Sequence, residues 1–495
     1  MSFYIKKITI IIIIIANSIK KISSIKEDLC LIFTFLRHGA RSPPLKNEKY
    51  DLLNEEWKIG SYKLTLIGQR QLFLLGNLFN KKYNNFINKN YSPSEIYIFS
   101  TDNDRTLMSA NSFLMGLFSY ENKFNFNEYN ILNSFPPFDK NLSDIKDFSN
   151  KLGNDKINFN NIQIIPIHII EERDRLNKFW NECPLIGNLL DENMKCKEIN
   201  DNAIKFNQSF SEELNKILNF DYDKYYFLNH KNISHFCNVL YSDIYDGRKL
   251  DIFNKTKINL TKLYNSCFET FQIDNIFYWG KNKEMNLIYS TSLLKKLINS
   301  LKSRVEININ KNNKNNNDDL YNENNPKMFV FSGHDYDLIS LIVSLKYIFN
   351  LNNGIFYPKF SSSLTIELYY KNNDLNNKIK ESDFIVKIYF NGELFMEIDY
   401  LKFYNEINNK MYNEEGIKKF CKKDNDNNKD DKKNDDNEKK NVEEYFNRRK
   451  NFQINYQGYF AIIFGILSLL EFIFLYRQIK KTKIRNYNNE YFNIK

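Results

Sequence analysis

The feature that most constrains the fold is a run of hydrophobic residues near the start of the chain, LIFTFL at positions 31–36. Its residues do not alternate between polar and apolar, so the run predicts a buried strand of a parallel sheet. The basic segment RHGARSP, residues 37–43, follows it directly. We therefore expect a buried strand whose carboxyl end carries a cluster of polar side chains.

Strand-like and helix-like patterns alternate beyond this run. Such alternation is typical of an α/β fold, in which helices flank a central, mostly parallel sheet. The segment from about 140 to 280 lacks strong strand patterns and is predicted to be a mostly helical insert. The other expected strands are 96–100, 328–332, 364–370 and 384–390, and the expected helices are 65–83, 106–118 and 338–349.

Two polar segments have too little hydrophobic content to pack into this domain. Residues 308–325, NINKNNKNNNDDLYNENN, are of low complexity and are predicted to form a disordered loop insertion. Residues 422–441 contain no hydrophobic residue. They predict a disordered stalk, reaching to about residue 455, that follows a folded domain over 26–420.

The two ends of the chain predict membrane targeting. Within residues 1–22, Lys6 and Lys7 precede a short apolar run, which predicts a signal peptide, with an uncleaved anchor as the alternative. Residues 458–476 are almost entirely apolar or small, and a basic cluster follows them. This pattern is typical of a transmembrane helix with its tail, 477–495, in the cytosol. We expect a single-pass type I membrane protein whose folded domain is lumenal or extracellular, in a lysosome-like or vacuole-like compartment or at the cell surface.

Composition narrows the partners and the compartment. The formal net charge is +10, but the basic residues are spread along the chain without interleaved aromatic residues, so no nucleic-acid partner is expected. The six cysteines form no CxxC pair, which argues against a zinc site, and an oxidising lumen would permit up to three disulfides. N-x-S/T sequons, typical of a glycoprotein, give mild support for secretion; they begin at Asn90, Asn141, Asn207, Asn232, Asn254 and Asn259.

Polar side chains follow three of the predicted strands, at the edge where ligands bind in open α/β sheets. A site there would gather three guanidiniums, two imidazoles and a carboxylate. Such a cluster repels itself unless an anion is bound, and arginine forks match phosphate oxygens. The polar residues that follow the strands are Arg37, His38 and Arg41 after the first, Asp102 and Arg105 after the second, and His334 and Asp335 after the third; all but Asp102 belong to the expected site.

These residue types indicate phosphoryl transfer. Three arginines suit the charge of a transferring phosphoryl group. Histidine is a phosphorus nucleophile when it is neutral and oriented. Asp335, beside His334, is the natural proton donor to a leaving alcohol. Gly39 would let the backbone approach the phosphate closely.

RHGARSP resembles the signature of the histidine acid phosphatase family, the RHGxRxP branch of the histidine phosphatase superfamily. Further segments resemble the family's pattern, so the resemblance covers about residues 30–420. They are WKIG and LT within 57–65, DRTLMSA at 104–110, PIHIIEERDRL at 166–176 before a Cys-Pro at 183–184, GHD at 333–335 and SSSLTIELYY at 361–370. The resemblance implies a phosphoglycerate mutase-like fold and acid phosphatase activity.

The resemblance also implies a role for each site residue. His38 is the nucleophile that forms a phosphohistidine, and Asp335 protonates the leaving group. No metal or organic cofactor is implied. Members of the family are often dimers, which makes a homodimer an expectation, and the C-terminal span makes the chain most similar to the membrane-bound lysosomal/prostatic type. The residues expected to bind phosphate are Arg37, Arg41, Arg105 and His334.

Two aromatic residues depart from the family's pattern. Tyr336 stands where Thr or Asn usually follows the His-Asp pair, and its phenol would either narrow the pocket or turn into the core. Tyr62 replaces a glycine of the segment that begins at Trp57.

The cysteines depart as well. The family's cysteine just before the 361–370 segment is missing. Cys237 is then free or paired elsewhere, with Cys267 as the candidate. The bridge that the resemblance implies joins Cys183 to Cys421.

Three functions stay open. The first is a secretory-pathway acid phosphomonoesterase acting on phosphate monoesters. The second is an enzyme of the same branch specialised for inositol phosphates or a lysophospholipid phosphate, since leaving-group contacts would come from the insert. The third is a catalytically silent phosphate-binding membrane protein, which the retained proton donor argues against. Phosphoglycerate mutases share RHG, but the arginine after it and the His-Asp pair argue against mutase chemistry.

Overall fold

The structure is a computed structural model of the chain. It describes residues 26–44, 57–118, 163–170, 183–218, 226–314, 325–351, 357–372 and 378–422. The predicted signal peptide, the stalk beyond residue 422, the transmembrane helix at 458–476 and the tail at 477–495 lie outside the described residues. Within the ranges that are described, no helix has the length and apolar character needed to cross a bilayer.

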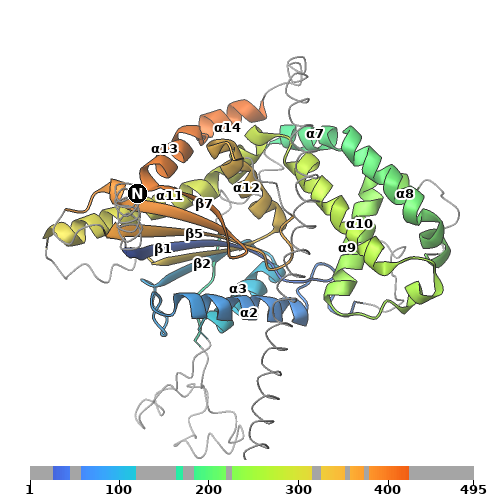
Figure 1. Ribbon diagram of the computed structural model, residues 1–495, viewed down its shortest axis with the longest axis horizontal. Helices are drawn as coiled ribbons and strands as arrows, with labels where there is room; N and C mark the ends of the chain where they lie inside the picture. The colour runs from blue at the N-terminus through green and yellow to red at the C-terminus, as the bar shows by residue number, and fades with distance from the viewer. Residues whose placement is uncertain are drawn as a thin grey trace, which may run out of the picture. The chain divides into compact units, whose positions relative to one another are not determined.

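The described residues form one seven-stranded sheet in the order β3-β2-β4-β1-β5-β6-β7 (Figure 1). The pairings from β3 to β1 are parallel, and those from β1 to β7 are antiparallel. The sheet is therefore mixed, with its parallel strands at one side. The strands are β1 (Lys26–Arg37), β2 (Ile96–Ser100), β3 (His168–Ile169), β4 (Met328–Gly333), β5 (Ser363–Asn372), β6 (Phe384–Phe390) and β7 (Glu393–Asp399).

β1 is buried on both faces, as the unbroken hydrophobic run predicts. Because successive side chains of a strand point to opposite faces, Phe33 and Phe35 enter one core cluster while Ile32 and Leu36 enter another. The middle residue of the run, Thr34, satisfies its hydroxyl by a 2.9 Å hydrogen bond with Thr365 of β5. The strand therefore needs helices on both sides of the sheet.

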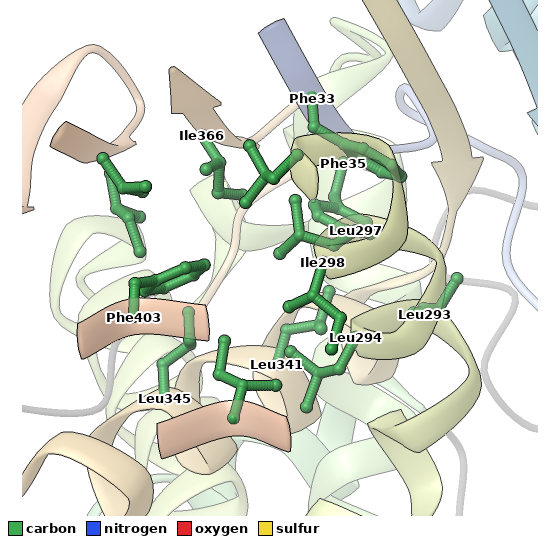
Figure 2. Packing of buried hydrophobic residues seen from close by; sticks show 14 of the residues in the cluster. Phe33, Phe35, Leu293, Leu294, Leu297, Ile298, Leu341, Leu345, Ile366 and Phe403 are labelled. Atoms are coloured by element: carbon green, nitrogen blue, oxygen red, sulfur yellow. The ribbon is translucent and has the colours of Figure 1, made fainter. Parts of the chain in front are cut away.

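Helices cover both faces (Figure 1). One buried cluster joins the sheet to α2 (Leu66–Tyr83) and α3 (Asp104–Leu117). The other joins it to α11 (Lys283–Lys314), α12 (Asp335–Phe349) and α13 (Tyr400–Lys410), and Figure 2 shows side chains of β1, α11, α12 and α13 converging there. A short helix, α14 (Glu414–Cys421), follows.

The helical insert has a core of its own, which is rich in aromatic side chains. Two disulfides constrain the insert. Cys237–Cys267 joins α9 to α10 within it, and Cys183–Cys421 joins the residue before α7 to the end of α14. Both expected pairings are therefore present. The insert contains α7 (Pro184–Asn193), α8 (Lys197–Ile217), α9 (His230–Tyr245), α10 (Leu260–Ile273), a π-helix (Asp274–Trp279) and short 3₁₀ turns at Tyr226–Leu228 and Asp251–Lys255.

The prediction of a disordered loop over 308–325 is wrong for its first part, because α11 continues to Lys314. Ile309 packs against the main core cluster, which gives this Asn-rich turn an apolar anchor. The returning chain also holds the helix, since Ser303 and Arg304 both donate hydrogen bonds to Asn325. Residues 315–324 lie outside the described part of the chain.

Candidate active site

The parallel strands end in register, and this brings the predicted site residues to one edge of the sheet. Arg37 of β1 pairs with Gly333 of β4, and Ser100 of β2 pairs with Ser332 of β4. His38 and His334 therefore leave neighbouring strands side by side, with ring centroids 5.5 Å apart. Arg105 reaches the same place from the first turn of α3, because that helix begins at Asp104, two residues before the expected start.

His38 is buried and held in one orientation. Its Nδ1 lies 2.8 Å from the carbonyl oxygen of Gly39. A carbonyl only accepts, so Nδ1 carries the proton and Nε2 keeps the lone pair. Burial, followed by the nearby Arg37 and His334, lowers the pKa of His38 well below its usual range. The imidazole is therefore neutral at mildly acidic pH.

The three arginines lie around the two histidines. Arg37 is 2% exposed, donates to the carbonyl of Pro358 and packs against the ring of Phe360 at 4.5 Å. Arg41 donates to Asn238 at 3.3 Å, and burial with two neighbouring cations lowers its pKa to about 10. Within the described residues, the Nε atoms of Arg37 and Arg105 have no hydrogen-bond partner. The cluster thus has unused donors, as an anion-binding site requires.

His334 is fixed by hydrogen bonds on both ring nitrogens. Arg105 donates to Nδ1 at 3.2 Å, so Nε2 carries the proton and donates to the hydroxyl of Thr101 at 3.1 Å. Burial, then Arg105, lowers the pKa of His334 to about 3. Its backbone N–H donates to Oδ2 of Asp337 at 2.7 Å, and burial raises the pKa of that carboxyl to about 8.

Asp335 forms an ion pair with Arg37, with Oδ2 and Nη2 2.7 Å apart. Burial alone would raise the pKa of this carboxyl, but Arg37, His334 and Arg41 outweigh it and the pKa is lowered. The ligand-free site therefore holds Asp335 as a carboxylate, although the expected proton donor must be protonated. Asp102, which the sequence also placed after the second strand, is exposed in the turn before α3.

The segment that begins at Trp57 shapes the loop after β1. Thr65 donates its backbone N–H to Ala40 and caps α2 through its hydroxyl. Gly39 serves a contact that the sequence analysis missed: a Cβ there would lie 2.3 Å from the carbonyl oxygen of Gly68. The two glycines let the loop that carries His38 rest directly on α2.

A family model described as the histidine phosphatase superfamily (branch 2) matches residues 31–391. The chain belongs to this family. The prostatic acid phosphatase of Bos taurus is 24% identical over 379 residues, covering 74% of this chain and 78% of the relative. The lysosomal acid phosphatase of Rattus norvegicus is 32% identical over 181 residues, 36% of each protein.

The fold of this histidine acid phosphatase also matches a solved structure. The phytase from Citrobacter braakii superimposes with a TM-score of 0.51 over 78% of this chain and 98% of the phytase. At 12% sequence identity the likeness concerns the fold alone. It confirms the α/β sheet with central parallel strands and an inserted helical region.

The histidine phosphatase has a pocket of about 430 Å³ beside the arginine cluster. Arg41 and Asp335 line it from the strand-end side, and α9 and the π-helix line it from the insert. Lys231, Ser234, His235 and Asn238 lie on one face of α9 at helical spacing and line the pocket together. Its aromatic residues are Tyr62, Phe271, Tyr278, Trp279 and Tyr357.

Sequence reasoning missed the insert residues that reach the site, above all Asn238, the partner of Arg41. The spacing 231, 234, 235, 238 marks one helix face, but it does not show what that face meets. Of the two alternatives for the Tyr336 phenol, the structure shows the inward one. The ring of Tyr336 stacks between His334 and Trp279 and packs on the main core cluster. The Tyr336 side chain points into the core and is not among the residues that line the pocket.

Proposed function

We propose that this histidine phosphatase is an acid phosphomonoesterase that works through a phosphohistidine on His38. The observation that supports it most is the neutral His38, with Nε2 free to attack, among three arginines whose donors are not all used. Arg37, Arg41, Arg105 and His334 would bind the phosphate oxygens, and their charge would stabilise the transferring phosphoryl group.

In the first step Nε2 of His38 attacks phosphorus and forms an N–P bond as the ester P–O bond breaks. The oxygen of the leaving group keeps the electron pair of that bond and takes a proton from Asp335, so an alcohol departs. In the second step water attacks phosphorus, a P–O bond forms as the N–P bond breaks, and the electron pair returns to Nε2 of His38. The proton of the water passes to Asp335, and inorganic phosphate is released.

Asp335 must gain a proton before the first step, although Arg37 stabilises its carboxylate in the free site. A phosphate monoester brings negative charge that competes for Arg37. An anion beside a carboxylate raises its pKa, because two like charges then share the site. Substrate binding would therefore prepare the donor, most readily at acidic pH.

The test is hydrolysis of p-nitrophenyl phosphate between pH 4 and 6 by the purified full-length chain. We expect turnover that His38→Ala abolishes, together with an acid-labile phosphoenzyme trapped on wild type alone. His168→Ala is the matched control, because His168 is exposed on β3 and stacks on Tyr97. Turnover that survives in His38→Ala would refute the proposal. A panel of a phosphopeptide, an inositol phosphate and lysophosphatidate would then separate the substrate classes.

We also propose a domain organisation. A phosphatase domain over 26–420 with its insert at about 140–280 would be followed by a stalk over 422–455, a transmembrane helix at 458–476 and a cytosolic tail. The two disulfides indicate an oxidising, secretory-pathway compartment. Protease added to sealed vesicles should remove only the tail. The lumenal fragment that remains should decrease in apparent mass when an endoglycosidase removes its glycans. Complete digestion would contradict the type I orientation.

A further inference from the structure

We propose that Tyr62 is a specificity-determining residue that selects leaving groups with an aromatic ring. The inference rests on the proposed function in one respect, since it concerns the group esterified to the phosphate. It starts from the backbone: Tyr62 has φ of +57°, a left-handed conformation that favours glycine. Backbone strain of this kind persists where the surrounding contacts hold the residue in place, often at ligand sites.

The surroundings of Tyr62 explain what the strained backbone achieves. The guanidinium of Arg41 lies 4.9 Å from the centre of its ring, and that of Arg105 lies 5.9 Å from it. Both contacts are within cation–π range. The ring is nevertheless 41% exposed, and Tyr62 lines the pocket. The left-handed turn thus puts an aromatic surface between the phosphate-binding arginines and the space for the leaving group.

The rest of the pocket is also built from fixed aromatic rings. Trp279 stacks on Tyr336 at 6.0 Å, and Tyr357 stacks on Phe271 at 5.0 Å. Rings already held in place lose little conformational freedom when a ligand packs on them. Aromatic rings that stack or meet edge-to-face attract each other beyond the effect of the apolar area that they bury. An aromatic ligand should therefore bind these rings more tightly than a saturated ligand of the same size.

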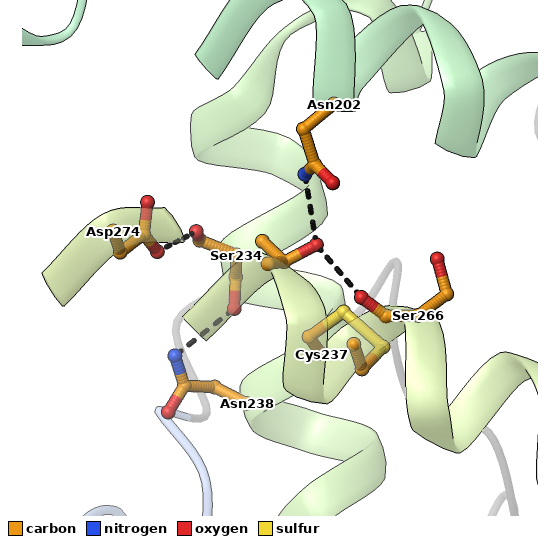
Figure 3. The surroundings of a disulfide bond; sticks show 8 residues. Asn202, Ser234, Cys237, Asn238, Ser266 and Asp274 are labelled. Carbon is orange, nitrogen blue, oxygen red and sulfur yellow. Dashed lines mark hydrogen bonds between the residues drawn. A yellow bond between two sulfur atoms is a disulfide. The ribbon is translucent and has the colours of Figure 1, made fainter. Parts of the chain in front are cut away.

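Several polar side chains of the pocket are already bonded within the insert or to Arg41. Ser234 donates to Asp274 at 2.7 Å, as Figure 3 shows, and Asp274 also bonds His230. Asn238 accepts from Arg41 and donates to the backbone of Ser234. These groups therefore have reduced capacity to bind a polar leaving group. The aromatic surfaces therefore remain a source of selectivity, beside Lys231 and the amide of Asn275, whose Nδ2 has no hydrogen-bond partner among the described residues.

The experiment compares phenylphosphonate with cyclohexylphosphonate, two non-hydrolysable ligands of similar size that differ in aromaticity. Calorimetry with the full-length chain at pH 5.5 should show that wild type prefers the phenyl compound roughly tenfold. Tyr62→Gly, which also removes the backbone strain, should lower the preference to less than about threefold. Tyr62→Phe should keep it, and Tyr62→Leu, which retains the bulk, should lose it.

The matched control is Asn350→Gly. Asn350 has φ of +51° at the carboxyl end of α12, so this change relieves a similar backbone conformation away from the pocket. Both affinities should be unchanged there. Equal wild-type affinity for the two phosphonates, no binding of either, or a preference that survives in Tyr62→Gly and Tyr62→Leu would overturn the inference. Selective binding by an enzyme that hydrolyses no ester would refute the catalytic proposal alone.

Discussion

The strand ends and the helical insert face the same pocket with different chemistry. At the strand ends, Arg37, His38 and His334 are buried, and the register of β1 with β4 brings them together. Arg105 donates to His334, and Arg37 pairs with Asp335. The insert contributes one face of α9 and several aromatic rings. Its own packing and the Cys237–Cys267 disulfide, rather than the sheet, fix these groups.

The difference suggests that the two sides of the pocket have separate roles. A phosphate group is the same in every monoester, so the side that binds it can be rigid and part of the framework. Leaving groups differ, and the side that meets them is formed mostly by a separate unit, with Tyr62 as a contribution from outside the insert. Changes at the strand ends should then affect all substrates, whereas changes in the insert, apart from Asn238, which bonds Arg41, should affect stability or selectivity.

The largest expected effect is that of Asp335→Asn, which tests the strand-end side. The amide cannot supply the proton, so turnover of a poor leaving group such as glycerol phosphate should fall about 10³-fold. p-Nitrophenyl phosphate needs little protonation and should lose much less. Measuring kcat for both esters is the test, and equal slowing would remove Asp335 from the donor role. Asp102→Asn, at an exposed site, is the control.

The next effect concerns the insert. Cys237 and Cys267 are 30 residues apart, so removing their bond in the Cys237→Ala/Cys267→Ala variant should cost roughly 3–4 kcal/mol of unfolding free energy in the chain-entropy model. Urea titration measures this cost, with Cys196→Ala, an unpaired cysteine, as the control. The inhibition constant of inorganic phosphate should change little. A large rise in that constant would contradict the proposal that the strand ends bind phosphate without support from the insert.

The third effect is on pH-dependent stability, and three buried groups of the strand-end side set its sign. His38 and His334 stay neutral when folded but take up protons when unfolded below about pH 6.5, so acid destabilises the fold. Asp337, with its pKa raised to about 8, binds its proton more tightly when folded. Its contribution is therefore full in acid and is lost as the pH rises toward 8.

The sum of these three contributions predicts greatest stability near pH 6.5. One net proton per molecule gives about 1.4 kcal/mol per pH unit, and the net uptake grows gradually on either side of pH 6.5, so the free energy of unfolding should be about 1 kcal/mol lower at pH 5 and at pH 8. Asp337→Asn should flatten the alkaline side and steepen the acid side, because only the two histidines then contribute, and its amide oxygen can still accept from His334. A monotonic profile in wild type would contradict the assignment.

The strand-end side was largely predictable from the sequence, for a physical reason. LIFTFL is a local pattern, and the basic motif adjoins it, so a correct strand places Arg37 and His38 at the sheet edge. Two strands were missed because their patterns are weak. β7 carries charges at Glu393, Glu397 and Asp399 and is an edge strand of the described sheet, and β3 contains two residues.

The insert side was predictable only as helices. Which face of α9 meets Arg41 depends on how the insert packs, and no local pattern encodes that. Tyr357 and Phe360, which pack against Arg37, lie in a segment between elements with no periodicity. The reason for Gly39 was hidden in the same way, because its contact partner Gly68 lies on α2.

The smallest expected effect tests the one hydrogen bond described here between Arg41 and the insert. Asn238→Ala removes the amide that accepts from Arg41 at 3.3 Å, which should cost about 1 kcal/mol, or about fivefold in the dissociation constant of inorganic phosphate. Calorimetry at pH 5.5 measures it, with Asn200→Ala on the exposed side of α8 as the control. An unchanged constant would make the two sides independent. A loss above about fiftyfold, beyond what one such bond supplies, would show that α9 positions the phosphate site itself.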